Sequence, residues 1–123
     1  MIISLLLATS SIGVATQEIH YVDLDIETFF PVTRKTLEKS VSEIDTPRLK
    51  EMVAVINRYV KDTKPKIVEN RMRILFSYNT KLYAVDAEGN LAVGEKGGRL
   101  ERPVRDHINR VLRRYSHEIV ENK

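Results

Sequence analysis

The chain has 123 residues, and 20 Lys and Arg against 17 Asp and Glu give it a net charge of +3. Hydrophobic residues make up 42% and charged residues 30%, a globular composition that excludes a disordered or collagen-like chain. Because the chain has no cysteine, disulfides, thiolate-bound zinc or iron–sulfur clusters, a cysteine nucleophile and a cysteine lipid anchor are also excluded.

The first fifteen residues carry no charged side chain. An apolar run, Ile2–Ala8, is followed by small and hydroxyl residues that end at Gly13 and Ala15. This pattern predicts a signal peptide, residues 1–15, cut after Ala15, although no Lys or Arg precedes the apolar run. The run is too short for a transmembrane helix, which needs about 20 apolar residues. A buried core element and a domain cropped from a longer chain are the alternatives.

Residues 16–123 are predicted to form a single α+β domain. Its first segment, Ile19–Leu24, is rich in β-branched and aromatic residues, which indicates either a short strand or a lead-in coil. A helix is predicted somewhere within Asp25–Ile44, because several apolar residues share one stripe at 100° per residue. These residues are Ile26, Phe30, Leu37, Val41 and Ile44. Since Pro31 interrupts the pattern, either the helix starts there or Ile26–Phe30 is a turn before it.

A second helix is predicted after Asp45, with Thr46 as its N-cap and Pro47 at the first helical position. Its apolar face is broad and repeats at helical spacing: Leu49, Met52, Val53, Ile56, Tyr59 and Val60. Little more than Asp45 separates the two helices, so they are predicted to form an antiparallel helical hairpin.

Three strands are predicted next. The first has apolar residues at alternate positions, the pattern of a half-buried strand, in Val68, Met72, Ile74, Phe76 and Tyr78, and Asn70 is the one exception on that side. Leu82–Val85 and Leu91–Val93 follow, and a glycine-containing loop joins them. The sequence therefore predicts a three-stranded antiparallel meander, which needs helices packed on it.

A last helix is predicted from about Pro103 to about Val120. Its apolar stripe has the width of a core-facing side: Val104, Ile108, Val111, Leu112, Tyr115 and Ile119. The predicted fold class is therefore α+β, with a helical hairpin, a three-stranded antiparallel meander and a C-terminal helix packed on the sheet.

Positive charge is concentrated in the second half of the chain and on the outer side of the last helix. Arg102, Arg110 and Arg113 lie opposite the apolar stripe, and Arg114 flanks it. The planar fork of arginine suits bidentate contacts with carboxylates or phosphates. These four arginines are therefore predicted to contact an acidic surface on a protein partner. The alternative is a solvated face that acidic residues four positions away, such as Asp106, partly neutralise.

The loop that precedes the last helix is a second candidate site. Gly97 and Gly98 permit an anion-binding nest beside Arg99, and a helix N-terminus follows. Because the loop matches neither a Walker nor a dinucleotide-binding pattern, a plain mobile connector is the competing interpretation.

No catalytic residue, metal site or cofactor is predicted. His107 and His117 are ten residues apart, which is not the spacing of a helical metal pair. The serines lack the flanking glycines of a nucleophile elbow. Asp23, Asp25 and Glu27 form an acidic cluster, which is predicted to complement the start of the following helix rather than to act in acid–base chemistry.

Together these patterns predict a small exported accessory protein, not an enzyme, that binds a protein partner through its basic C-terminal helix. The mature chain would begin at Thr16 and contain no transmembrane span. Export without disulfides is more typical of the bacterial envelope, periplasmic or extracellular, than of eukaryotic secretion. If residues 1–15 are not a cleaved signal, the same helix suits a cytosolic nucleic-acid-binding or regulatory module. A hydrolase that uses His20, His107 and the acidic cluster is a third class, against which the missing nucleophile motif argues.

Overall fold

The structure is a computed structural model that describes residues 15–28 and 30–121, with side chains up to residue 113. The predicted signal peptide lies outside the described residues except for Ala15. The elements are β1 (Thr16–Tyr21), α2 (Arg34–Leu37), β2 (Val41–Asp45), α3 (Thr46–Asn57), β3 (Val60–Lys61), β4 (Met72–Tyr78), β5 (Lys81–Asp86), β6 (Leu91–Val93), β7 (Gly97–Gly98) and α4 (Arg102–Glu121).

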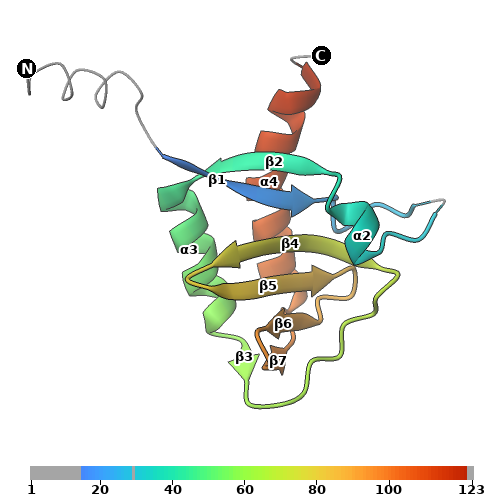
Figure 1. Ribbon diagram of the computed structural model, residues 1–123, viewed down its shortest axis with the longest axis vertical. Helices are drawn as coiled ribbons and strands as arrows, with labels where there is room; N and C mark the ends of the chain where they lie inside the picture. The colour runs from blue at the N-terminus through green and yellow to red at the C-terminus, as the bar shows by residue number, and fades with distance from the viewer. Residues whose placement is uncertain (1–14, 29, 122–123) are drawn as a thin grey trace, which may run out of the picture.

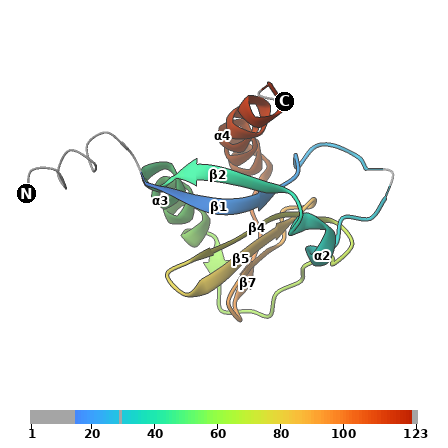
Figure 2. The ribbon, with the colours of Figure 1, turned by 45° about the horizontal axis from the view of Figure 1, so that its top comes forward.

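The described chain has a mixed α+β fold built on a five-stranded antiparallel sheet in the order β2-β1-β4-β5-β6. The three predicted strands are therefore part of a larger sheet, which β1 and β2 extend. Strands β3 and β7 form a separate two-stranded sheet. Helices α3 and α4 lie on one side of the large sheet (Figures 1 and 2). The short helix α2 packs against the other face of the sheet through Leu37.

Two apolar clusters pack on the two faces of the sheet. The larger one joins α3 and α4 to the sheet, and α4 contributes Ile108 and Leu112, which are each 1% exposed. The smaller cluster lies on the opposite face and contains Leu37 of α2. An antiparallel sheet covered in this way buries both faces, and α4 packs on it as the sequence predicts.

The predicted helix within Asp25–Ile44 is much shorter than its apolar stripe suggests: among the described residues of this segment the structure has the single helical turn of α2, and strand β2 follows. Of the predicted apolar stripe, Ile26 and Phe30 are 52% and 80% exposed. In β2 the side chains alternate between buried and exposed, with Ser42 and Ile44 inside. All five residues of β2 pair with β1, and this pairing outweighs the helical spacing of the apolar residues in this segment.

Since α3 follows a strand rather than a helix, the predicted helical hairpin is wrong. The second helix is confirmed, but it ends at Asn57, before Tyr59 and Val60 of the predicted apolar face, and Val60 belongs to β3. Its N-cap is Asp45, whose Oδ1 accepts a 2.8 Å hydrogen bond from the backbone N–H of Arg48. The Thr46 N–H and hydroxyl instead donate to the carbonyl oxygen of Ala15, at 2.9 and 3.0 Å. These bonds attach the start of α3 to the residue before β1.

Strand β4 departs from strict alternation at Arg73. The register with β5 shifts between Met72 and Ile74, as in a β-bulge. Met72 therefore packs in the smaller cluster with Leu75, whereas Ile74 packs in the larger one. Strict alternation predicts that Met72 and Ile74 lie on the same face of the sheet, but the bulge places them on opposite faces. Arg73 is 3% exposed and donates to the carbonyl oxygens of Met72 and Ile26 at 2.9 and 3.3 Å.

Candidate functional site

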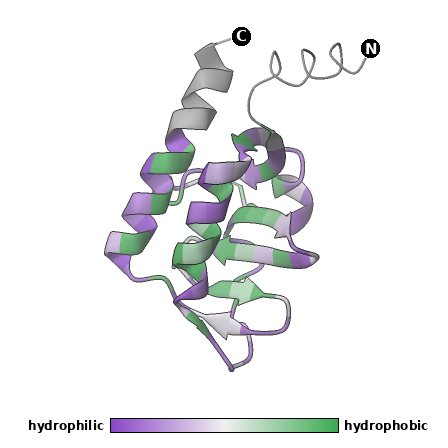
Figure 3. Cartoon of the chain, turned by 90° about the vertical axis from the view of Figure 1, so that its left-hand side faces the viewer, coloured by the Kyte–Doolittle hydropathy of each residue, from purple (hydrophilic) through white to green (hydrophobic). Residues whose placement is uncertain are grey.

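Helix α4 has one side in the core and one side in solvent, as its strong periodicity predicts. Ile108 and Leu112 are buried, whereas Arg102, Arg110 and Arg113 are exposed. Figure 3 shows α4 beside α3, with bands of hydrophilic and hydrophobic residues on both helices. The structure thus places three of the four predicted arginines on the solvent side of α4. The side chain of the fourth, Arg114, lies outside the described residues.

Arg102 and Arg110 form no ion pair in the described part of the chain, although Arg102 lines a pocket that Asp25, Glu27 and Asp106 also line. No ion pair or side-chain hydrogen bond is recorded for either residue among the described side chains. The neutralising pair expected between Asp106 and Arg110 is not formed. Both guanidinium groups therefore keep all five donors available to a second molecule.

Arg113 differs from these two arginines because it is bound to its own chain. Its Nε donates to Oδ2 of Asp23 at 2.7 Å, and its Nη2 lies 3.8 Å from Oδ2 of Asp25. The hydrogen bond to Asp23 raises the pKa of Arg113 further above its usual range. The prediction that Asp23 and Asp25 complement a helix N-terminus is wrong, because they bind the middle of α4 instead.

The same carboxylates meet Asn109, a buried residue of α4 that is 2% exposed. Its Oδ1 accepts hydrogen bonds from the Tyr21 hydroxyl at 2.5 Å and from the Leu24 N–H at 3.0 Å. Its Nδ2 donates to Asp23 and Asp25 at 3.0 and 3.1 Å. Asn109 therefore attaches the end of β1 and the turn after it to α4. No sequence motif marks Asn109, because its partners lie more than 80 residues away.

The pKa values of the two ionisable groups at this contact, Asp23 and Tyr21, shift in opposite directions. Burial alone would raise the pKa of Asp23, but hydrogen bonds from Arg113 and Asn109 outweigh it, so the pKa lies below its usual value. Burial raises the pKa of the Tyr21 phenol, and the Asp23 carboxylate raises it further. Asp23 is therefore a carboxylate and Tyr21 a neutral donor at physiological pH, which suits a structural contact.

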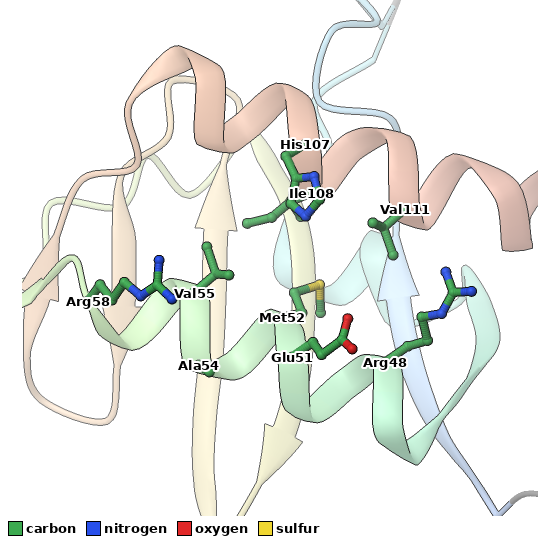
Figure 4. A pocket seen from close by; sticks show the side chains of 9 residues that line it. All are labelled: Arg48, Glu51, Met52, Ala54, Val55, Arg58, His107, Ile108 and Val111. Carbon is green, nitrogen blue, oxygen red and sulfur yellow. The ribbon is translucent and has the colours of Figure 1, made fainter.

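A groove of about 470 Å³ lies between α3 and α4. Met52, Val55, Ile108 and Val111 form its apolar floor, and Arg48, Glu51, Arg58 and His107 contribute polar groups. Figure 4 shows Arg48 and Arg58 at opposite ends, with Val55 and Val111 between them. Arg58 is ten positions after Arg48, which corresponds to about 15 Å along a helix axis. Sequence reasoning missed this groove because it depends on how α3 and α4 pack together.

The two glycines of the predicted anion-binding nest lie in a strand. Gly97 and Gly98 form β7, which pairs with β3, and the Gly97 N–H donates to the Thr63 carbonyl oxygen at 2.7 Å. The glycines therefore serve strand pairing rather than an open nest. Gly98 and Arg99 nevertheless line a pocket of about 320 Å³ together with Lys61, Thr63, Lys64, Lys66 and Asn90.

The histidines and carboxylates are dispersed in the described part of the chain. Among these residues, no group of three or more His, Asp or Glu side chains is placed to hold a metal ion. His20 lies on β1, with its Nε2 3.7 Å from Glu18, and His107 lies in the groove on α4. Within the same residues, no helix combines the length and hydropathy needed to cross a bilayer.

Comparisons with protein-family models, curated proteins and solved structures found no match to this chain.

Proposed function

We propose that this chain is a non-enzymatic binding protein that holds an acidic surface of a protein partner against the solvent side of α4. The observation that carries the proposal is the pair Arg102 and Arg110, which are exposed and form no ion pair among the described residues. Arginine is the cation best suited to bidentate carboxylate contacts. Arg113 contributes less, because its guanidinium already binds Asp23.

The groove between α3 and α4 supplies apolar contact area on the same helix, although neither Arg102 nor Arg110 lines it. Partly exposed Val55 and Val111 lie in it, and Arg48 and Arg58 lie at its ends. A partner segment with apolar side chains flanked by carboxylates would be complementary to it in both hydropathy and charge. One acidic partner could therefore contact both the groove and the arginines of α4.

The partner is expected to bind at least tenfold more weakly to a variant with both Arg102→Glu and Arg110→Glu, a loss of about 1.4 kcal/mol or more. The association rate should fall most, because exposed charges steer encounter. The melting temperature should change little, because exposed charges contribute little to folding. The measurement is surface plasmon resonance at several salt concentrations, with the partner first isolated from the native host by cross-linking.

The matched control is Lys35→Glu with Lys39→Glu, which makes the same charge change at exposed positions in and after α2. This control should bind the partner as the wild type does. An equal loss in both variants would show that net charge alone matters. Isolation of nucleic acid in place of a protein would contradict the proposal and favour the nucleic-acid-binding class.

We further propose that the protein is exported and that its mature form begins at Thr16. Strand β1 begins at this residue, so cleavage after Ala15 leaves every strand residue in place. The new α-ammonium group would lie on the strand position opposite Asp45, whose charge is complementary.

N-terminal sequencing of the protein purified from its native host should therefore read Thr16-Gln17-Glu18. Cleavage removes the Ala15 carbonyl group that accepts from Thr46, so the mature chain should be slightly less stable than a variant that retains Ala15. A product that begins at Met1 or Ile2 and is recovered from the cytosol would contradict export.

A further inference from the structure

A second charged surface lies at the other end of the molecule from the start of β1, around the small sheet of β3 and β7 (Figure 1). Its pocket of about 320 Å³ is lined by Lys61, Lys64, Lys66 and Arg99, together with Thr63, Asn90 and Gly98. No acidic residue lines this pocket. Asp62, the acidic residue in the middle of the lysine-rich segment, is not among its lining residues.

The pocket is assembled by a close approach of two segments that lie far apart in the sequence. Val60 pairs with Gly98 and Lys61 with Gly97, which brings Arg99 next to the lysines. A Cβ atom on Gly98 would lie 2.2 Å from the Tyr59 carbonyl oxygen, and one on Gly97 would lie 2.7 Å from that of Lys64. Only glycine permits this approach at the two positions. The two glycines therefore contribute to the basic pocket by allowing Arg99 to lie close to the lysine-rich segment.

The four positive charges are uncompensated within the described residues. None of them takes part in a recorded ion pair there, and all four residues are exposed. Like charges around one cavity repel each other and raise the local concentration of anions. The Thr63 hydroxyl adds a neutral donor to the three donors of each lysine ammonium and the five of the Arg99 guanidinium.

The volume of the pocket indicates the size of the anion. The pocket is open to solvent, and its volume of about 320 Å³ is many times the roughly 10–15 Å³ that one water molecule needs on the same measure. That is more room than a single phosphate group fills. Ammonium and guanidinium groups are the usual partners of phosphate oxygens in proteins.

We propose that this pocket binds a small soluble compound with two or more linked phosphate groups, held by Lys61, Lys64, Lys66 and Arg99. The site shares no residue with the partner-binding surface of α4. Separate variants can therefore test anion binding in this pocket and partner binding by α4 independently of each other.

The test is isothermal titration calorimetry of the full chain with pyrophosphate, with inorganic phosphate for comparison. Pyrophosphate should bind at least tenfold more tightly than phosphate, and its affinity should fall with added salt. Lys64→Gln with Lys66→Gln should weaken pyrophosphate binding at least tenfold without lowering the melting temperature, because both lysines are exposed and unpaired in the described structure. Amide resonances of Thr63 and Gly98 should shift on titration.

Lys35→Gln with Lys39→Gln is the matched control, because it removes the same charge from an exposed region away from the pocket. This control should change pyrophosphate affinity less than twofold. Two results would overturn the proposal: an equal loss in the control, or no binding of pyrophosphate to the wild type, including the case in which the protein binds phosphatidic acid vesicles alone. That last case would assign the lysines to a membrane surface instead.

Discussion

Replacement of Asn109 with leucine is expected to lower the free energy of unfolding by about 3–5 kcal/mol. The substitution removes four hydrogen bonds from a residue that is 2% exposed. It leaves the Leu24 N–H and the Tyr21 hydroxyl buried without their main acceptor, and each such group costs about 1–3 kcal/mol. The measurement is urea denaturation at neutral pH, followed by circular dichroism.

A second variant, Asn109→Asp, distinguishes lost hydrogen bonds from a poor fit of the leucine side chain. The aspartate retains an acceptor for Tyr21 and Leu24 but presents a carboxylate to Asp23 and Asp25, so it should also be strongly destabilising. The matched control is Asn70→Leu at an exposed position, which should change stability by no more than about 0.5 kcal/mol. A loss below about 1 kcal/mol for Asn109→Leu would show that the contact with α4 contributes little.

Replacement of Asp86 with alanine is expected to cost about 3–5 kcal/mol of unfolding free energy. This carboxylate is fully buried and accepts four hydrogen bonds, each of 2.9 Å. Three of the donors are backbone N–H groups, those of Val68, Glu88 and Asn90. Alanine removes the acceptor of all these donors at a position that is 0% exposed. Chemical denaturation measures the loss.

The conservative variant Asp86→Asn keeps the shape and one acceptor oxygen, but its amide faces a donor where the second oxygen was. It should therefore lie between the wild type and Asp86→Ala in stability. Asp62→Ala, at an exposed position, is the matched control and should be nearly neutral. Equal stability of Asp86→Ala and the wild type would show that solvent replaces the carboxylate at no cost.

These two polar residues also support the two proposed binding surfaces. Asn109 holds Asp23 in place, and Asp23 in turn binds Arg113 on α4. Asp86 binds the N–H of Val68, two residues after Lys66 of the basic pocket. Structural polar contacts of this kind act on a binding site through its position rather than by touching a ligand.

Part of the candidate site is predictable from sequence because it depends on one helix. The spacing of Ile108 and Leu112 predicts which side of α4 is buried, and Arg102 and Arg110 then lie on the other side. The same reasoning cannot show that Arg113 is bound to Asp23, which lies 90 residues earlier in the chain. It likewise cannot place Arg99 beside Lys61, because that depends on the pairing of β3 with β7.

The sequence by itself determined the elements whose signal is local. A broad apolar stripe defines α3 and α4, and two short apolar runs joined by a glycine-containing loop define β5 and β6. Only the tertiary structure decided that Val41–Asp45 is a strand, that β4 bulges at Arg73, and that Asn109 and Asp86 are central polar contacts. The physical reason is that hydrogen-bond partners distant in the chain outweigh local preferences, which differ by only about 1 kcal/mol per residue.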